Sequence, residues 1–145
     1  MADIVRGASA QWNGTIKEGS GTFGVDSGVI KDVPYTFAAR FETAPGTNPE
    51  ELIGAAHAAC FTMNLTGTLG KYGFTAKTIN TTASVTLSGP QPGGRKVLKI
   101  VLTTRASVDG IDAAKFQEIA TEAEQTCPIS NALRAVPIEL DAALV

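Results

Sequence analysis

The longest stretch without a charged side chain is predicted to form a helix that begins at Pro49 and ends near Leu69. Asn48 is suited to cap this helix, proline fits its first position, and the two glutamates that follow favour the positive end of the helix dipole. Residues 52–69 hold no Asp, Glu, Lys or Arg and no continuous polar face. A helix that is apolar all round is typical of a buried position, so we expect it to be the central helix of the fold.

The segments on either side of this helix carry the alternation of β-strands. Residues 9–40 predict short antiparallel strands separated by glycine-rich turns, and the run 35–41 continues that meander. Residues 74–88 and 95–107 are rich in Thr, Val, Ile and Leu and predict two long strands joined by a loop of Gly and Pro. Residues 137–144 alternate again and predict a closing strand.

Between the last two predicted strands the pattern changes to helical spacing. Asp112 is a suitable N-cap for a helix over 113–126, with apolar side chains on one face and Glu124 among those on the outer face. A short helix over 129–134 follows. The order of strands, helix, strands, helices and strand predicts an α+β fold, with mostly antiparallel sheet on the central helix, in a single domain over 1–145.

Composition narrows the classes of protein that fit. The chain has 145 residues, with 12 basic and 14 acidic side chains and a net charge of −2, which argues against a binder of nucleic acids or anionic membranes. It has no apolar run of about 20 residues and no secretory signal at its N-terminus, so we expect a cytoplasmic protein. In that reducing compartment its two cysteines are not expected to form a permanent disulfide.

Most short motifs in the chain lack the surrounding elements or spacing that their function requires. Residues 19–24 match the letters of a dinucleotide-binding fingerprint, but no strand–turn–helix unit surrounds them, and their glycines fit strand bends better. The single histidine and the two distant cysteines lack the spacing of a metal site.

The cysteines leave alternatives open. Cys127 precedes a proline near a helix start, where the dipole lowers a thiol pKa, whereas the apolar helix around Cys60 raises the pKa of that thiol unless a cation is close. His57 lies three residues before Cys60 on the same helix face. Two interpretations fit this spacing: a nucleophile pair of Cys60 with His57, and a histidine that is only buried in the apolar helix. Composition alone favours two structural cysteines over thiol redox chemistry.

Longer segments are more specific. The segment 47–63, Thr-Asn-Pro-Glu-Glu-Leu-Ile-Gly-Ala-Ala-His-Ala-Ala-Cys-Phe-Thr-Met, resembles the central helix of the OsmC/Ohr family of osmotically inducible and organic hydroperoxide resistance proteins. Residues 127–133 and the pattern over 12–42 are similar to the same family. The position of Arg40 just ahead of the helix resembles the OsmC branch more than the Ohr branch.

The resemblance implies an intertwined homodimer, with sheets wrapped around two long central helices, and a peroxidase that acts on organic hydroperoxides and on hydrogen peroxide in stress defence. It implies that Cys60 is the peroxidatic cysteine, Cys127 the resolving one, Arg40 the cation that activates the thiolate and Glu50 the carboxylate that orients Arg40. It also implies a lipoyl-type dithiol as reductant and no bound cofactor. Apolar neighbours of Cys60, such as Phe61 and Met63, are expected to favour alkyl hydroperoxides.

One distance follows from helix geometry. Glu50 and Cys60 are ten residues apart, which is about 15 Å along one straight helix. Either the helix breaks between them or Glu50 reaches the Cys60 of a second subunit, and the apolar central helix favours an obligate dimer with its sites at the interface. Two other interpretations remain: a non-catalytic dimeric module that binds small ligands, with structural cysteines, and a hydrolase that uses Cys60 with His57.

Overall fold

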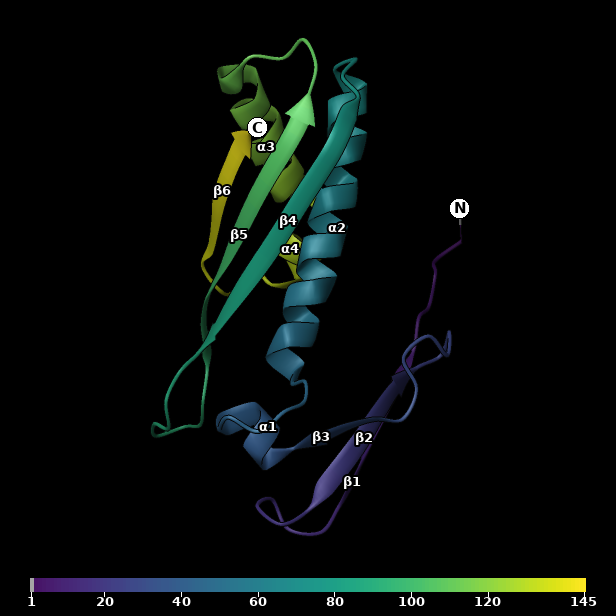
Figure 1. Cartoon of the computed structure of the whole chain (residues 1–145), viewed down its shortest axis with the longest axis vertical. Coiled ribbons are helices and arrows are strands. Elements are labelled where there is room, and N and C mark those ends of the chain that lie inside the picture. The colour runs from purple at the N-terminus through teal and green to yellow at the C-terminus, as the bar shows by residue number, and fades with distance from the viewer. Residues whose placement is uncertain (1) are drawn as a thin grey trace. The chain divides into compact units, whose positions relative to one another are not determined.

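In the computed structural model, residues 2–145 are described, and they form two compact units that divide between Pro49 and Glu50. The first unit holds a three-stranded antiparallel sheet in the order β1 (Ala8–Asn13), β2 (Ser20–Val25) and β3 (Val33–Thr36) (Figure 1). These strands confirm the predicted meander. Whether both units belong to one domain stays a prediction.

The meander ends earlier than its alternating pattern predicts. Residues 37–41 were expected to continue the last strand, but they form the short helix α1 (Phe37–Phe41). The hydroxyl of Thr36 accepts a hydrogen bond of 3.1 Å from the backbone N–H of Ala39 and so caps this helix. A capping threonine satisfies a backbone donor that a strand would leave to a neighbour, and this local gain ends the strand.

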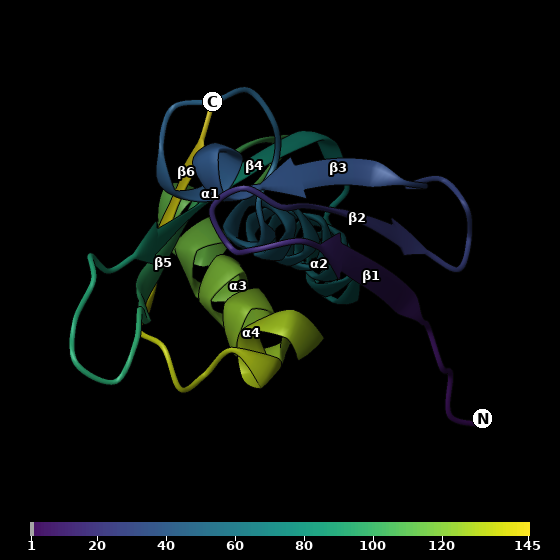
Figure 2. The same cartoon turned by 90° about the horizontal axis from the view of Figure 1, so that it is seen from below.

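The second unit is an α/β layer built around the long helix. Its elements in chain order are α2 (Pro49–Lys71), β4 (Ala76–Leu87), β5 (Val97–Val108), α3 (Ala113–Thr126), α4 (Pro128–Ala132) and β6 (Ile138–Leu144). The strands form one sheet in the order β4-β5-β6, antiparallel in the first pair and parallel in the second. The parallel pairing requires a crossover, which α3 and α4 supply, and α2 and α3 lie on the same face of the sheet (Figures 1 and 2).

Helix α3 follows its sequence signals closely. Asp112 accepts a hydrogen bond of 2.8 Å from the Lys115 backbone N–H, as an N-cap does, and Phe116 and Ile119 are buried on the predicted face. Glu124 is the exception, because it was expected outside and is buried. An ion pair of 2.8 Å with Arg134 compensates its carboxylate, and no periodicity within the helix reveals that partner.

The core joins one face of α2 to the sheet and to α3. Its fully buried apolar side chains come from α2 (Phe61, Leu65, Leu69), β5 (Ile100, Leu102, Ala106) and α3 (Phe116, Ile119, Ala120, Ala123), with Cys127 beside them. A polar contact also joins α2 to the sheet, where the Thr62 hydroxyl donates to that of Thr81 on β4 at 2.8 Å.

The expectation that α2 is buried all round does not hold for one chain. Its buried residues recur every three or four positions and form one face, whereas Ala55, Ala59 and Met63 on the other side are exposed. Across residues 2–145 no helix is both long and apolar enough to span a bilayer.

Candidate active site

The two cysteines lie at the junction of three helices. Cys60 is at the middle of α2, and Cys127 is the single residue between α3 and α4, where it occupies the C-cap position of one helix and the N-cap position of the other. Both thiols are free, and their Sγ atoms are 3.3 Å apart and share a hydrogen bond. Cys127 is fully buried and Cys60 is partly accessible. The fold therefore brings together two thiols that are 67 residues apart in the sequence.

The surroundings of Cys60 act on its pKa in opposite directions. Burial is the largest influence and raises the pKa of the Cys60 thiol, as expected for an apolar helix, and the hydrogen bond shared with Cys127 raises it further. A backbone hydrogen bond from Ile129 to the sulfur opposes this rise. Ile129 follows Pro128, which has no N–H, so it carries the first free backbone donor of α4.

The separation of the sulfurs is suited to reversible disulfide chemistry. A disulfide bond is about 2.05 Å long, so the sulfurs at 3.3 Å need to approach by only about 1.3 Å to form one. Cys60 is the thiol that a molecule from solvent can reach, and the buried Cys127 thiol lies next to it. This arrangement supports oxidation of Cys60 followed by attack from Cys127.

The structure pairs His57 with Ser130 and not with Cys60. Its Nε2 shares a hydrogen bond of 2.7 Å with Oγ of Ser130 on α4, and its Nδ1 finds no partner among residues 2–145. Burial lowers the pKa of His57, the Glu124 carboxylate opposes that shift, and Arg134 adds to it. Neither ring nitrogen bonds the Cys60 sulfur, so the hydrolase interpretation lacks its general base.

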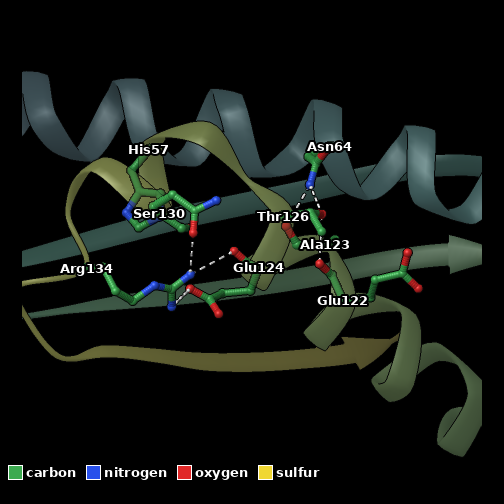
Figure 3. A network of polar contacts seen from close by, with 9 residues as sticks. His57, Asn64, Glu122, Ala123, Glu124, Thr126, Ser130 and Arg134 are labelled. Carbon is green, nitrogen blue, oxygen red and sulfur yellow. Dashed lines mark hydrogen bonds and ion pairs between the residues drawn. The ribbon is translucent and has the colours of Figure 1, made fainter.

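Further polar contacts lie around Cys127, and their residues were not predicted as site residues. Asn64 on α2 donates to the carbonyl of Ala123 at 2.7 Å and to the hydroxyl of Thr126 at 2.8 Å, both near the end of α3 (Figure 3). Arg134 binds Glu124 at 2.8 Å, and its second nitrogen donates to the Asn131 side chain at 3.2 Å. The sequence signal for the His57–Ser130 contact is the equal three-residue spacing from His57 to Cys60 and from Cys127 to Ser130.

The other two predicted site residues belong to α1 and to the start of α2. Arg40 is on α1 in the first unit, where its guanidinium lies 5.0 Å from the ring centroid of Phe41. Glu50 is in the first turn of α2, which continues without a break past Cys60. The separation of ten positions between Glu50 and Cys60 therefore corresponds to about 15 Å along the helix axis, so Glu50 does not meet the Cys60 of its own chain.

The expected substrate-facing side chains are also distributed differently. Phe61 is completely buried in the core, whereas Met63 is 74% exposed on the opposite side of α2. Within residues 2–145, no three or more His, Cys, Asp or Glu side chains gather as a metal site would require.

The chain has relatives among known proteins. The profile of the OsmC-like protein family matches residues 42–141. The chain is 48% identical to peroxiredoxin OsmC of Escherichia coli strain K12 over 132 residues, which cover 91% of this chain and 92% of the relative. It is 38% identical to an organic hydroperoxide resistance protein of Xanthomonas axonopodis pv. citri over 91 residues, or 61% of each chain.

The fold has its counterparts among solved structures. The crystal structure of an organic hydroperoxide resistance protein from Elizabethkingia anophelis superposes with a TM-score of 0.77 at 23% identity, covering 99% of this chain and 100% of the other. That likeness concerns the fold alone. The family profile and the sequence identity establish that this chain belongs to the OsmC-like protein family.

Proposed function

We propose that this protein is a cysteine-dependent peroxidase that reduces organic hydroperoxides, and hydrogen peroxide, in oxidative and osmotic stress defence. The observation that carries the proposal is the pair of free thiols at 3.3 Å, one partly accessible and one buried. The names of the relatives, a peroxiredoxin and a hydroperoxide resistance protein, support the same activity.

The reaction begins at Cys60. Its thiolate attacks the terminal oxygen of the hydroperoxide, a sulfur–oxygen bond forms, and the O–O bond breaks. The released alkoxide takes up a proton to become the alcohol, and Cys60 is left as a sulfenic acid. The Ile129 hydrogen bond favours the attacking thiolate, because it lowers the pKa that burial raises.

Cys127 completes the oxidation. Its thiolate attacks the sulfur of the Cys60 sulfenic acid, the disulfide forms, and hydroxide leaves as water after protonation. An external dithiol then opens the disulfide by exchange and is itself oxidised to a cyclic disulfide, which returns both cysteines to thiols. A lipoyl-type dithiol suits this step because its two thiols close a ring in a single molecule. No bound cofactor takes part.

Arg40 and Glu50 complete the site in this proposal. Burial raises the pKa of Cys60. The unit that holds both cysteines contributes no cation to the groups that shift this pKa. Arg40 would supply the cation and polarise the peroxide, and Glu50 would hold the guanidinium fork. Because Glu50 lies about 15 Å along α2 from its own Cys60, it would serve the partner subunit of a homodimer.

The activity test compares wild type with two variants under one assay. Consumption of cumene hydroperoxide is followed with reduced dihydrolipoamide for wild type, Cys60→Ser and Cys127→Ser. Cys60→Ser is expected to be inactive, whereas Cys127→Ser reacts once without the reductant and stalls as a trappable sulfenic acid. Wild-type turnover in both variants would refute the proposal and leave the dimeric binding module with structural cysteines as the better interpretation.

Subunit mixing tests the position of Glu50. Cys60→Ser and Glu50→Gln chains are unfolded together, refolded as a mixture and assayed beside each variant refolded alone. If Glu50 acts across a two-fold interface, mixed dimers regain one complete site each, or about a quarter of all sites after random pairing. No gain over the separate variants would place Glu50 within its own chain or outside the site, and a monomer with full activity would refute the dimer.

A further inference from the structure

The sulfur pair lies in the middle of a regular series of contacts between α2 and the segment that contains α3 and α4. Positions 57, 60 and 64 on α2 contact positions 130, 127 and 123 in that order, through the His57–Ser130, Cys60–Cys127 and Asn64–Ala123 contacts. The spacing of three and four residues places all three on one face of α2. The two segments therefore run antiparallel in a single register, with a polar contact on each side of the sulfurs.

We infer that the His57–Ser130 and Asn64–Ala123 contacts form a clamp that holds the Cys127 sulfur against Cys60 and sets the rate of the resolving step. The inference rests on the proposed peroxidase function. It adds positioning residues for disulfide formation, which act through the cysteines and do not touch the substrate.

The first arm of the clamp fixes α4. His57 and Ser130 are both fully buried, and their hydrogen bond of 2.7 Å is short. Since α4 is only five residues long, this contact limits the movement of the whole element. Cys127 immediately precedes α4, so displacement of α4 moves the Cys127 sulfur as well.

The second arm fixes the end of α3. The carbonyl of Ala123 is among the last four of that helix, which lack intrahelical partners, and Asn64 donates to it at 2.7 Å. The same amide nitrogen donates to Thr126, the residue before Cys127, at 2.8 Å. Figure 3 shows this side chain reaching from α2 to both groups. Cys127 is thus held from both directions along the chain.

The clamp matters because the sulfenic acid has two fates. Attack by Cys127 forms the disulfide and releases water, whereas a second hydroperoxide adds another oxygen to Cys60 and yields an irreversible sulfinic acid and an alcohol. Both products arise from the same intermediate. Their ratio at a fixed hydroperoxide concentration therefore reports the resolving step, whatever the rate of the first attack.

The experiment measures this ratio by intact-protein mass spectrometry. Reduced protein is treated with graded cumene hydroperoxide without a reductant, for wild type, Ser130→Ala, Asn64→Ala and the double variant. Ser130→Ala removes one hydrogen bond of about 1 kcal/mol and is expected to lower the ratio of disulfide to sulfinic acid about fivefold. Asn64→Ala removes the bonds to both Ala123 and Thr126 and is expected to lower the ratio by at least this factor, and the double variant by at least about twenty-five-fold.

Two controls separate positioning from general loosening. Thr62→Val removes a hydrogen bond from the same helix to Thr81 on β4, and it is expected to leave the ratio within twofold of wild type. His57→Gln keeps a polar group at the reach of Nε2 and is expected to retain most of the ratio, whereas His57→Leu loses it. Because the two arms lie on opposite sides of the sulfurs, either arm decides the question if a variant of the other does not fold.

The outcomes distinguish this inference from the proposed function. Ratios for Ser130→Ala and Asn64→Ala within twofold of wild type, or an equal fall in Thr62→Val, would overturn the clamp while leaving the peroxidase intact. Wild type that forms neither disulfide nor sulfinic acid would instead overturn the proposed function.

Discussion

Oxidation of the cysteine pair is predicted to stabilise the folded protein by an amount that depends on the length of chain between the two cysteines. A Cys60–Cys127 disulfide would close a loop of 67 residues. The loss of chain entropy from the unfolded state for such a loop corresponds to about 4 kcal/mol at 25 °C. Little of this is expected to be lost to distortion of the fold, because the sulfurs at 3.3 Å need to move by only about 1.3 Å.

Urea unfolding of the reduced and oxidised forms measures the difference. Wild type is unfolded with excess dithiol, or after treatment with one equivalent of hydroperoxide, at one fixed protein concentration so that any association contributes equally. The oxidised form is expected to unfold at higher urea with a shallower dependence on urea, because the crosslinked unfolded state exposes less surface. In a thermal scan the difference corresponds to a rise of about 10 °C in Tm.

The control for this prediction is Cys127→Ser, which is expected to unfold at the same urea concentration after either treatment. Oxidised wild type no more stable than the reduced form would refute the reasoning, since it would mean that closing the disulfide strains the fold by as much as the loop entropy stabilises it. An equal gain in Cys127→Ser would show that the stabilisation does not come from this crosslink.

Three further perturbations test the polar groups around the site. Burial lowers the pKa of His57, so the unfolded state binds its proton more readily and the free energy of unfolding is expected to fall as the pH drops below 6.5; urea titrations should show this component in wild type and not in His57→Gln. Burial raises the pKa of Cys60, so the reduced protein is expected to lose stability as the pH rises past 9.0, and the same titrations of Cys60→Ser should lack that loss. Arg134→Met leaves the Glu124 carboxylate, with a side chain only 12% exposed, without its cation, and a lowering of the free energy of unfolding by about 2 kcal/mol is expected in urea; no change relative to wild type would show that the ion pair contributes nothing.

The sequence predicts the elements of this fold well where local signals agree. The α2 helix begins at its proline, and α3 begins after the Asp112 cap, because capping and helical spacing indicate the same boundaries. The run at 37–41 was assigned wrongly, because alternation over a few residues does not register the competing cap at Thr36. The parallel pairing of β5 with β6 depends on a crossover, so no local pattern contains it.

The candidate site divides in a similar way. The resemblance singled out both cysteines, but only the folded chain brings their sulfurs to 3.3 Å. The partners of His57 and Asn64 lie 73 and 59 residues away in the sequence. The periodicity of a local segment carries no information about contacts between residues so far apart. The position of Glu124 on the helix face does not predict its burial, because that burial depends on a cation ten residues further along the chain. Burial of polar side chains is decided by tertiary partners, which is why these contacts emerge only in the structure.

The surface of α2 and the reach of Glu50 support the same assembly. A helix without charged side chains over residues 52–69 is suited to burial all round, yet in one chain Ala55, Ala59 and Met63 remain exposed. Independently, Glu50 lies about 15 Å along that helix from Cys60, and an uninterrupted helix gives it no way to return. A second copy across a two-fold axis would cover the exposed face and place the first turn of one α2 near the middle of the other. The dimer proposed here thus accounts for an apolar surface and for a carboxylate that is remote from its own thiol, two features that packing within a single chain leaves unrelated.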